Sequence, residues 1–412
     1  MTKARTTEPV RNQREIRFET PDDAIGAEHP ARALWQALGK LDLSAFLDGA
    51  RAVEGGSGRP THSPRMMLTL WTYAISDGVG SAREIARKIQ SDSAYGWICR
   101  GVDVSHQVLS RFRVGHRAAL DELMTDVLAV LMRANVLSLR LVAQDGMRVR
   151  AAASAPSFRR LESLEECREQ AALHLKAVLA QADDPELTRA QHAARVAGAL
   201  DFHRRVEAAA AEIQEIHESR GASERPTRAS TTDAEARVMK MADGGFRPAM
   251  NVQMATAGSE LGGARTIVAV NVTNVGSDMG AVTPMLDQIE RRTGKLPETL
   301  LADANHGNHA TISAAHARGV NMLVPVPKRT RESGAKGDRT PEIEQWKQRM
   351  ETDEAKRLYR ARASLCEWTN AHAAGRFGLR QLLVRGIDKA TSVALLIAIT
   401  SNLMQHLTIL GG

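Results

Sequence analysis

Cysteine and aromatic residues are scarce in this sequence. The chain of 412 residues has three cysteines, which stand far apart, form no CxxC pair and match no zinc-binding spacing. This pattern excludes a disulfide scaffold and a cysteine-based zinc site, and it predicts reduced thiols in a cytoplasmic protein. Aromatic residues make up 4% of the chain against 43% hydrophobic residues, so aliphatic side chains and methionine must fill the core.

Long hydrophobic runs are also missing. The longest apolar stretch, residues 390–403, is too short and too polar to span a bilayer. The charged N-terminus lacks the apolar segment that a signal peptide needs. We therefore expect neither secretion nor a membrane partner.

Positive charge is in excess. The formal net charge is +7 and the sequence pI is about 9.5, which favours an anionic partner such as nucleic acid. A basic protein without such a partner would show the same balance, so charge alone does not decide.

The first third of the chain has a helical pattern. Residues 1–20 are polar and suggest a flexible arm, and apolar residues then recur at helical spacing through residues 21–136. A break followed by a short basic helix at residues 105–113, with Arg111 and Arg113, resembles a helix-turn-helix that reads DNA. A small helical subdomain without DNA contact gives the same pattern.

The stretch LRLVAQDGMRVR, residues 139–150, predicts a buried strand that ends in Asp145. An acid at such a place must be paired, hydrogen-bonded or bound to a metal. Taken alone, it could simply cap its own turn. Residues 156–230 then predict two long helices broken near Pro185, which form an inserted helical hairpin. By default we interpret this hairpin as a solvent-exposed addition to the fold without a binding role. Contact with DNA or with a second subunit is the alternative.

Strand and helix patterns alternate after the insertion. Strands are expected at residues 248–255, 265–273, 299–302 and 321–326, with helices between them. Asp303 directly follows the third of these strands, and Asp278 is expected to cap the helix that begins at Met279. A late helix, from residue 342 or 352 to 372, carries Glu367, and Asp388 should cap the final helix. The order predicts an α/β fold.

Three carboxylates, Asp145, Asp303 and Glu367, therefore lie at two strand ends and on a late helix. Strand ends at one edge of an α/β sheet converge on a crevice, and a helix packed there can add a third acid. Hard oxygen donors of this kind suit Mg²⁺ or Mn²⁺. Two such ions can stabilise the attacking and leaving oxygens of a phosphoryl transfer.

With these residues in place, the sequence resembles the bacterial insertion-sequence transposases with an RNase H-like DDE domain. The resemblance covers residues 20–407. The stretches that carry it are AEHPARALW, SPRMMLTLWTYAISDGVGSAREIARKI, VLSRFR, LVAQDG, FRPAMNVQMA, LLADANHGN, YRARASLCEW, LLVRGIDKA and SNLMQHL. Tyr359, Arg362 and Glu367 keep the spacing of the family's Tyr–Arg–Glu signature. His306 replaces a usual tyrosine, and Arg376 stands near the place of a usual lysine.

The resemblance implies an α/β RNase H-like catalytic domain, with a mixed central sheet flanked by helices, at residues 137–407. An all-α DNA-binding domain (21–136) would precede it, and the hairpin (156–230) would be inserted in it. Asp145, Asp303 and Glu367 would hold two Mg²⁺ or Mn²⁺ ions. Tyr359, Arg362, Arg376, Arg111 and Arg113 are the expected DNA or phosphate contacts.

The implied activity is metal-dependent cleavage and strand transfer of double-stranded DNA at the ends of the protein's own insertion sequence, and into target DNA. A homodimer or larger assembly on DNA, associated with the nucleoid in the bacterial cytoplasm, is expected. Two alternatives stay open at this point. One is a catalytically inactive, transposase-derived DNA-binding protein, and the other is an RNase H-like nuclease without strand transfer. Glu351, Asp353 and Glu354 are weaker choices for the third acid.

Overall fold

The structure is a computed structural model, and it describes residues 20–49, 60–181, 184, 186–220, 227–327 and 340–410. Nearly all of the expected arm at residues 1–20, and most of the loops expected at residues 51–62 and 327–341, lie outside the described residues. The charged turn at Pro185 also lies outside them.

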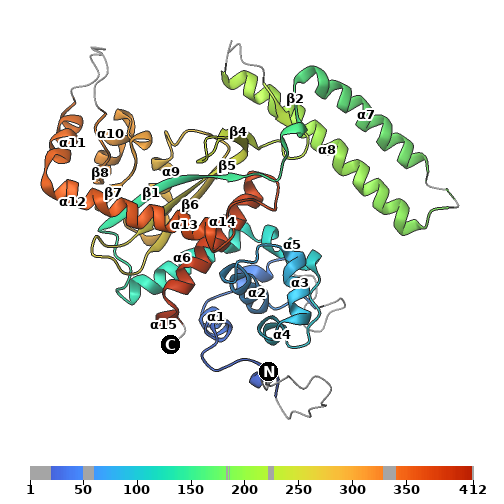
Figure 1. Cartoon of the computed structure of the whole chain (residues 1–412), viewed down its shortest axis with the longest axis horizontal. Helices are drawn as coiled ribbons and strands as arrows, with labels where there is room; N and C mark the ends of the chain where they lie inside the picture. Colours follow the sequence, from blue (N-terminus) through green and yellow to red (C-terminus); the bar gives the residue numbers. More distant parts are fainter. Residues whose placement is uncertain are drawn as a thin grey trace, which may run out of the picture.

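Helices make up the described part of the N-terminal third (Figure 1). Their bounds are η1 Pro21–Ala24, α1 Pro30–Gly39, η2 Ser44–Leu47, α2 Pro64–Ser76, α3 Ala82–Ser91, α4 Ser93–Cys99, α5 His106–Gly115 and α6 Arg117–Arg133. Serine caps explain three of the helix starts. Ser63, Ser81 and Ser105 each accept a hydrogen bond from a backbone N–H three residues on.

A six-stranded mixed sheet follows. Its strands are β1 Leu141–Arg150, β4 Arg237–Lys240, β5 Phe246–Ala257, β6 Thr266–Thr273, β7 Thr299–Leu301 and β8 Asn321–Leu323. The order is β4-β5-β1-β7-β8, and β6 also pairs with β5. The pairs β1–β5, β4–β5 and β5–β6 are antiparallel, whereas β1–β7 and β7–β8 are parallel. The predicted mixed sheet with flanking helices is confirmed.

Helix α14 (Ile387–Gln405) joins the sheet to the N-terminal helices. It packs on β6 and also on α2, α5 and α6, and one continuous hydrophobic core runs from Ile25 to Leu410. By length and composition α14 could cross a membrane, but 72% of its most apolar window is buried inside the protein. Helix α14 is therefore a core helix, and the core crosses the domain boundary expected at residue 136.

The other face of the sheet is covered by the late helices. Leu141, Ala143, Leu301 and Leu323 form a separate small cluster with residues of α12 (Asp353–Arg362) and of the π-helical turn η5 (Ala363–Glu367). Helices α11 (Pro341–Glu351) and α13 (Trp368–Gly375) flank them. The single late helix expected from sequence is thus broken at Thr352, which caps α12, and it contains a π turn.

The inserted hairpin projects from the body of the molecule (Figure 1). It consists of α7 (Leu161–Ala180) and α8 (Arg189–Arg220), and a short antiparallel pair closes its base, β2 (Phe158–Arg159) with β3 (Ala229–Ser230). Arg237 of β4 forms an ion pair with Glu212 of α8. The strand pairing closes the hairpin at its base, and the ion pair joins α8 to the sheet through β4.

Two predicted caps are wrong. Helix α9 (Val282–Thr293) begins three residues after Met279, and Asp278 is buried in a polar network instead. Helix α14 has Gly386 at its N-cap, and the Glu235 carboxylate accepts from the backbone N–H of Ile387 at 3.0 Å. Asp388 pairs with Arg117 at 2.9 Å on the surface. The N-terminus of α14 thus depends on a residue distant in sequence, and the partners of Asp278 are distant as well, which local spacing does not reveal.

Candidate active site

Asp145 lies where the parallel pairing of β1 ends. Strand β1 pairs with β7 only as far as Ala143, whereas it continues along β5 to Arg150. The sequence prediction placed Asp145 at the end of the strand, and the strand in fact continues past it. Side chains alternate along a strand, so Asp145 points to the same face as Leu141 and Ala143, which α12 and η5 cover.

Two side chains from the late helices contact Asp145. Arg362 Nη2 lies 3.3 Å from Asp145 Oδ1, and Asn370 Nδ2 donates to Asp145 Oδ2 at 3.2 Å. Burial raises the pKa of Asp145, more than the Arg362 charge lowers it, and the nearby Asp303 carboxylate raises it further. The sequence prediction gave Arg362 as a DNA or phosphate contact and did not single out Asn370.

Asp303 follows β7 and caps the short helix η4 (Ala304–His306). Its Oδ1 accepts from the backbone N–H of Asn305 at 3.0 Å and lies 2.6 Å from His306 Nδ1. Burial acts to raise the pKa of Asp303, but the His306 hydrogen bond and charge, with Arg362, lower it on balance. The two carboxylates thus have pKa values shifted in opposite directions, as often occurs at functional sites.

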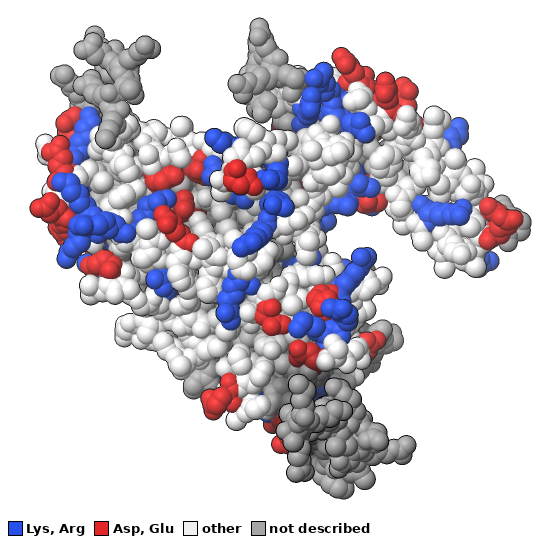
Figure 2. Space-filling model, viewed as in Figure 1, with Lys and Arg blue, Asp and Glu red and all other residues white. Residues whose placement is uncertain are grey.

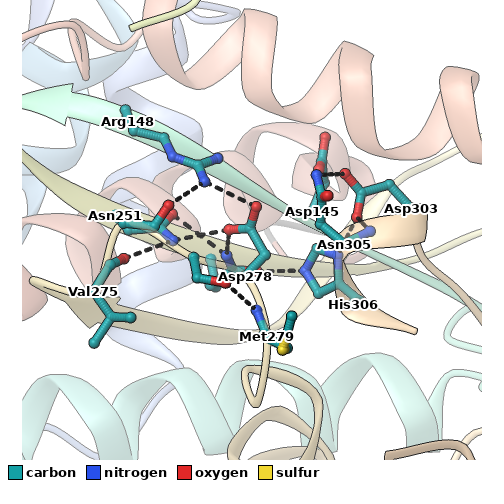
Figure 3. Close-up of polar contacts among 12 residues, drawn as sticks. Asp145, Arg148, Asn251, Val275, Asp278, Met279, Asp303, Asn305 and His306 are labelled. Atoms are coloured by element: carbon teal, nitrogen blue, oxygen red, sulfur yellow. Dashed lines mark hydrogen bonds and ion pairs between the residues drawn. The ribbon is translucent and has the colours of Figure 1, made fainter. Parts of the chain in front are cut away.

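A buried polar network extends from His306 across the sheet (Figure 3). His306 is fully buried, and its Nε2 lies 3.1 Å from Gln253 Oε1. The Gln253 amide donates through Nε2 to Asp278 Oδ1 at 2.7 Å, which fixes the orientation of the amide. Asp278 also accepts from Asn251 at 2.8 Å and from Arg148 at 3.0 Å. The two His306 nitrogens therefore face the oxygens Asp303 Oδ1 and Gln253 Oε1, which hold the ring between the acid and the network.

Gly146 is required by this network. A Cβ atom at position 146 would lie 2.1 Å from Gln253 Nε2 and 2.6 Å from Asp278 Oδ1. No other residue fits beside Asp145 without displacing the polar side chains on the opposite face of β1. The Asp-Gly pair in the sequence is thus a packing requirement and not a turn.

Glu367 is the last residue of the π turn and is exposed. Within the described residues, no three His, Cys, Asp or Glu side chains lie close enough together to hold a metal ion. The structure therefore brings together Asp145 and Asp303 but does not place Glu367 against them. All three carboxylates nevertheless affect the pKa of one thiol. Burial, then Asp145, Glu367 and Asp303 raise the pKa of the buried Cys366.

The predicted DNA contacts have different surroundings. Tyr359 is half-buried, and burial together with Asp303 and Asp145 raises its pKa, so it lies beside the acids. Arg111 and Arg376 are exposed. Arg113 is only 6% exposed, its guanidinium lies 4.7 Å from the Trp71 ring, and it donates to the Gly80 carbonyl at 2.8 Å. The predicted DNA contact by Arg113 is therefore not retained.

Sequence reasoning missed the polar network behind the acids. Asn251 and Gln253 alternate with apolar residues in β5, and the residues on either side of them in that strand are buried. Gln144, directly before Asp145 in β1, is a third buried polar residue of this kind. Buried polar residues in a central strand are unusual and require partners. That signal was present in the sequence, whereas the identity of the partners Asp278 and His306 depends on the fold.

Two family models match the chain. The model described as Transposase domain (DUF772) matches residues 19–115, and the model described as Transposase DDE domain matches residues 215–403. Neither a curated protein nor a solved structure matches it. The second match begins within α8, and the hairpin separates β1 and Asp145 from the region it covers.

The two matches lie in the expected order and together span more than two thirds of the chain, which belongs to the insertion-sequence DDE transposases. This family implies an RNase H-like fold and DNA as partner, and its members generally use divalent metal ions. The chemistry of this site suits a divalent metal ion, because Asp145 and Asp303 offer hard carboxylate oxygens side by side.

Proposed function

We propose that this transposase cleaves double-stranded DNA at the ends of its own insertion sequence and joins the freed ends to target DNA. The observation that carries the proposal is the pair Asp145 and Asp303, which lie within one electrostatic neighbourhood together with Arg362 and Tyr359. The mixed sheet contains three antiparallel and two parallel pairs of strands, and this arrangement supports an RNase H-like catalytic domain.

Asp145, Asp303 and Glu367 are proposed to hold Mg²⁺ or Mn²⁺, as two ions. The π turn supports Glu367 as the third acid. In a π turn the repeat is i to i+5, so the turn carries Glu367 back toward the side of the helix that bears Arg362, whose guanidinium contacts Asp145. In a regular α-helix the same five residues would turn Glu367 away from that face.

The bound ions would lower the pKa of the attacking hydroxyl and spread the charge that develops on the phosphate. The protein's own groups have separate roles. Arg362 offers planar donors to a phosphate, Tyr359 offers a phenolic hydroxyl beside the acids, and Asn370 holds Asp145 in place. His306 keeps Asp303 ionised and oriented.

The remaining assignments belong to the same proposal. Residues 21–136 are proposed to bind the element ends, with the exposed Arg111 as one contact, and residues 137–407 to form the catalytic domain with the 156–230 insertion. Arg376 is proposed to contact phosphate. The active form would be a homodimer or larger on DNA, acting at the nucleoid in the bacterial cytoplasm.

The test is cleavage of a labelled duplex that carries the element's end, with Glu367→Gln and Glu354→Gln compared with wild type. Glu354 is exposed on the first turn of α12, so it controls for removal of one acid from the late helices. We expect Glu367→Gln to abolish cleavage and Glu354→Gln to leave it unchanged. Cleavage that persists in Glu367→Gln would move the third acid elsewhere.

A strand-transfer assay separates the alternatives. Pre-cleaved element ends are incubated with supercoiled target plasmid and Mg²⁺, and joined products are counted. Cleavage without joining would indicate a nuclease of the same fold. Tight binding of the element's end by wild type without either reaction would indicate an inactive, transposase-derived DNA-binding protein.

A further inference from the structure

A large cleft lies at the base of the inserted hairpin. It has a volume of about 1660 Å³ and is bounded by β1, the β4–β5 hairpin, α8, α13 and the segment that follows α13. Gly146 and Asn370 are among its lining residues. Because Gly146 follows Asp145 and Asn370 donates to it, the cleft opens directly beside the proposed catalytic acid.

The cleft carries an excess of free positive charge. Seven of its lining residues are Lys or Arg and three are acidic. Three of the cations are neutralised, since Arg148, Arg237 and Arg247 form ion pairs with Asp278, Glu212 and Asp243. The other four have no ion pair within the described part of the chain and are exposed: Arg150, Arg228, Lys240 and Arg380. Among the lining acids, only Glu215 is similarly free.

The walls of the cleft are rigidly joined. The backbone N–H of Arg150 donates to the Arg380 carbonyl at 3.2 Å, and the N–H of Leu382 donates to the Arg150 carbonyl at 2.8 Å. Arg205 of α8 donates to the Thr231 carbonyl at 3.3 Å. The first two bonds hold the backbones of Arg150 and Arg380 together in the wall of the cleft, and Figure 2 shows Lys and Arg side chains along the hollow between the hairpin and the body.

We propose that this cleft binds the phosphate backbone of duplex DNA, so that the base of the inserted hairpin forms one wall of the path that leads DNA to Asp145. The inference rests on the proposed function, because its partner is that function's DNA substrate. Rows of unpaired Lys and Arg supply the sequence-independent part of DNA affinity. The insertion is then part of the DNA-binding surface and not a decoration.

The first test compares two quadruple variants that remove the same number of positive charges. The cleft variant replaces Arg150, Arg228, Lys240 and Arg380 with Ala. The control variant replaces four exposed cations of the hairpin that lie outside the cleft, namely Lys176, Arg189, Arg195 and Arg204. Binding of the labelled element end is measured by fluorescence anisotropy with EDTA at several salt concentrations.

The cleft variant should bind the element end more weakly than wild type. The slope of log K against log salt should become shallower by about 0.9 for each phosphate that the variant no longer neutralises. The control variant should keep the wild-type slope. Equal slopes for the two variants would overturn the inference. If wild type cleaves DNA but the two variants bind it equally well, the role of the cleft is refuted and the proposed function is not. If wild type neither binds nor cleaves the element end, the proposed function is refuted as well.

A second test does not depend on weakened binding. Glu215→Lys adds a cation to the cleft, and Glu169→Lys adds one on the exposed surface of α7. We expect Glu215→Lys to tighten binding several-fold more than Glu169→Lys, an increase that misfolding would not produce. A photo-crosslinking amino acid at Val238 in the cleft should attach to DNA, and one at the exposed Leu173 of the hairpin should not. Equal increases or crosslinking only at Leu173 would contradict the proposed path.

Discussion

Asn370 donates a hydrogen bond to Asp145 across 225 positions of sequence, at 3.2 Å. The contact joins helix α13 to strand β1, and the π turn η5 lies between Asn370 and Arg362, the other side chain that contacts Asp145. The bulge adds one residue to the turn, so residues 362 and 370, eight apart, lie on one face of the helix. The late helix thus contacts Asp145 at two places that lie about two turns apart.

Asn370→Ala and Asn370→Asp should differ in their effect on cleavage. Removal of the amide should lower the cleavage rate by about 10- to 100-fold, the usual cost of removing a partner that orients a metal ligand. Asn370→Asp should cost more, because a second carboxylate beside Asp145 raises its pKa further. Single-turnover rates with Mg²⁺ measure both. Equal rates for wild type and Asn370→Ala would show that the amide does not position Asp145.

His306→Phe should make cleavage more sensitive to acid. The His306 hydrogen bond and charge lower the pKa of Asp303 against the effect of burial, so their removal raises it. Asp303 would then be protonated at higher pH, and protonated carboxyl groups do not bind metal. The acid limb of the pH–rate profile should therefore move to higher pH. A limb that stays in place or moves to lower pH would contradict this role for His306.

Gly146→Ala should destabilise the protein, because the added Cβ would overlap Gln253 and Asp278. We expect a decrease of about 1–3 kcal/mol in the free energy of unfolding, measured by urea denaturation. Gly198→Ala in α8 is the control, since nothing lies within 4 Å of its Cβ, and it should raise that free energy by about 0.5–1 kcal/mol. A neutral Gly146→Ala would mean that the network behind Asp145 adapts easily.

Arg111→Ala and Arg113→Ala should separate DNA affinity from stability. Arg113 is buried over Trp71, and burial lowers its pKa to about 10. Its removal should cost about 1–3 kcal/mol of unfolding free energy, since the Gly80 carbonyl loses its donor. Arg111→Ala should change stability by less than about 0.5 kcal/mol and weaken DNA binding. Thermal melts and anisotropy titrations measure the two effects, and the opposite pattern would refute the assignment.

Local patterns in the sequence predicted the strands whose formation depends on the alternation and type of neighbouring side chains. The alternation in residues 139–150 and the run at 265–273 became β1 and β6 as predicted. Asp145 and Asp303 come together because β1 and β7 pair in parallel only as far as Ala143 and Leu301, and each acid lies two residues beyond the end of that pairing. That is a topological rule which needs no coordinates.

Other features depend on residues brought together only by the fold. Asp278 looked like a helix cap, but it accepts from Asn251 and Gln253 of β5. Arg113 looked like a groove contact until its burial against Trp71 was seen. The π turn has no signature in the run ASLCE, because an extra residue in a helix is stabilised by its packing against neighbouring elements. The strand β4 was too short to show a periodic pattern.

The decisive measurement of the roles of Asp145 and Asp303 is cleavage of a labelled duplex that carries the element's end. Wild type, Asp145→Asn and Asp303→Asn are each tested separately. Each reaction is run with Mg²⁺, Mn²⁺ or EDTA, and binding is followed in parallel. We expect cuts at the element boundary by wild type with either metal, no cuts by either variant or with EDTA, and unchanged DNA binding. Cleavage that survives both substitutions would contradict the assignment of these two carboxylates as the metal-binding centre.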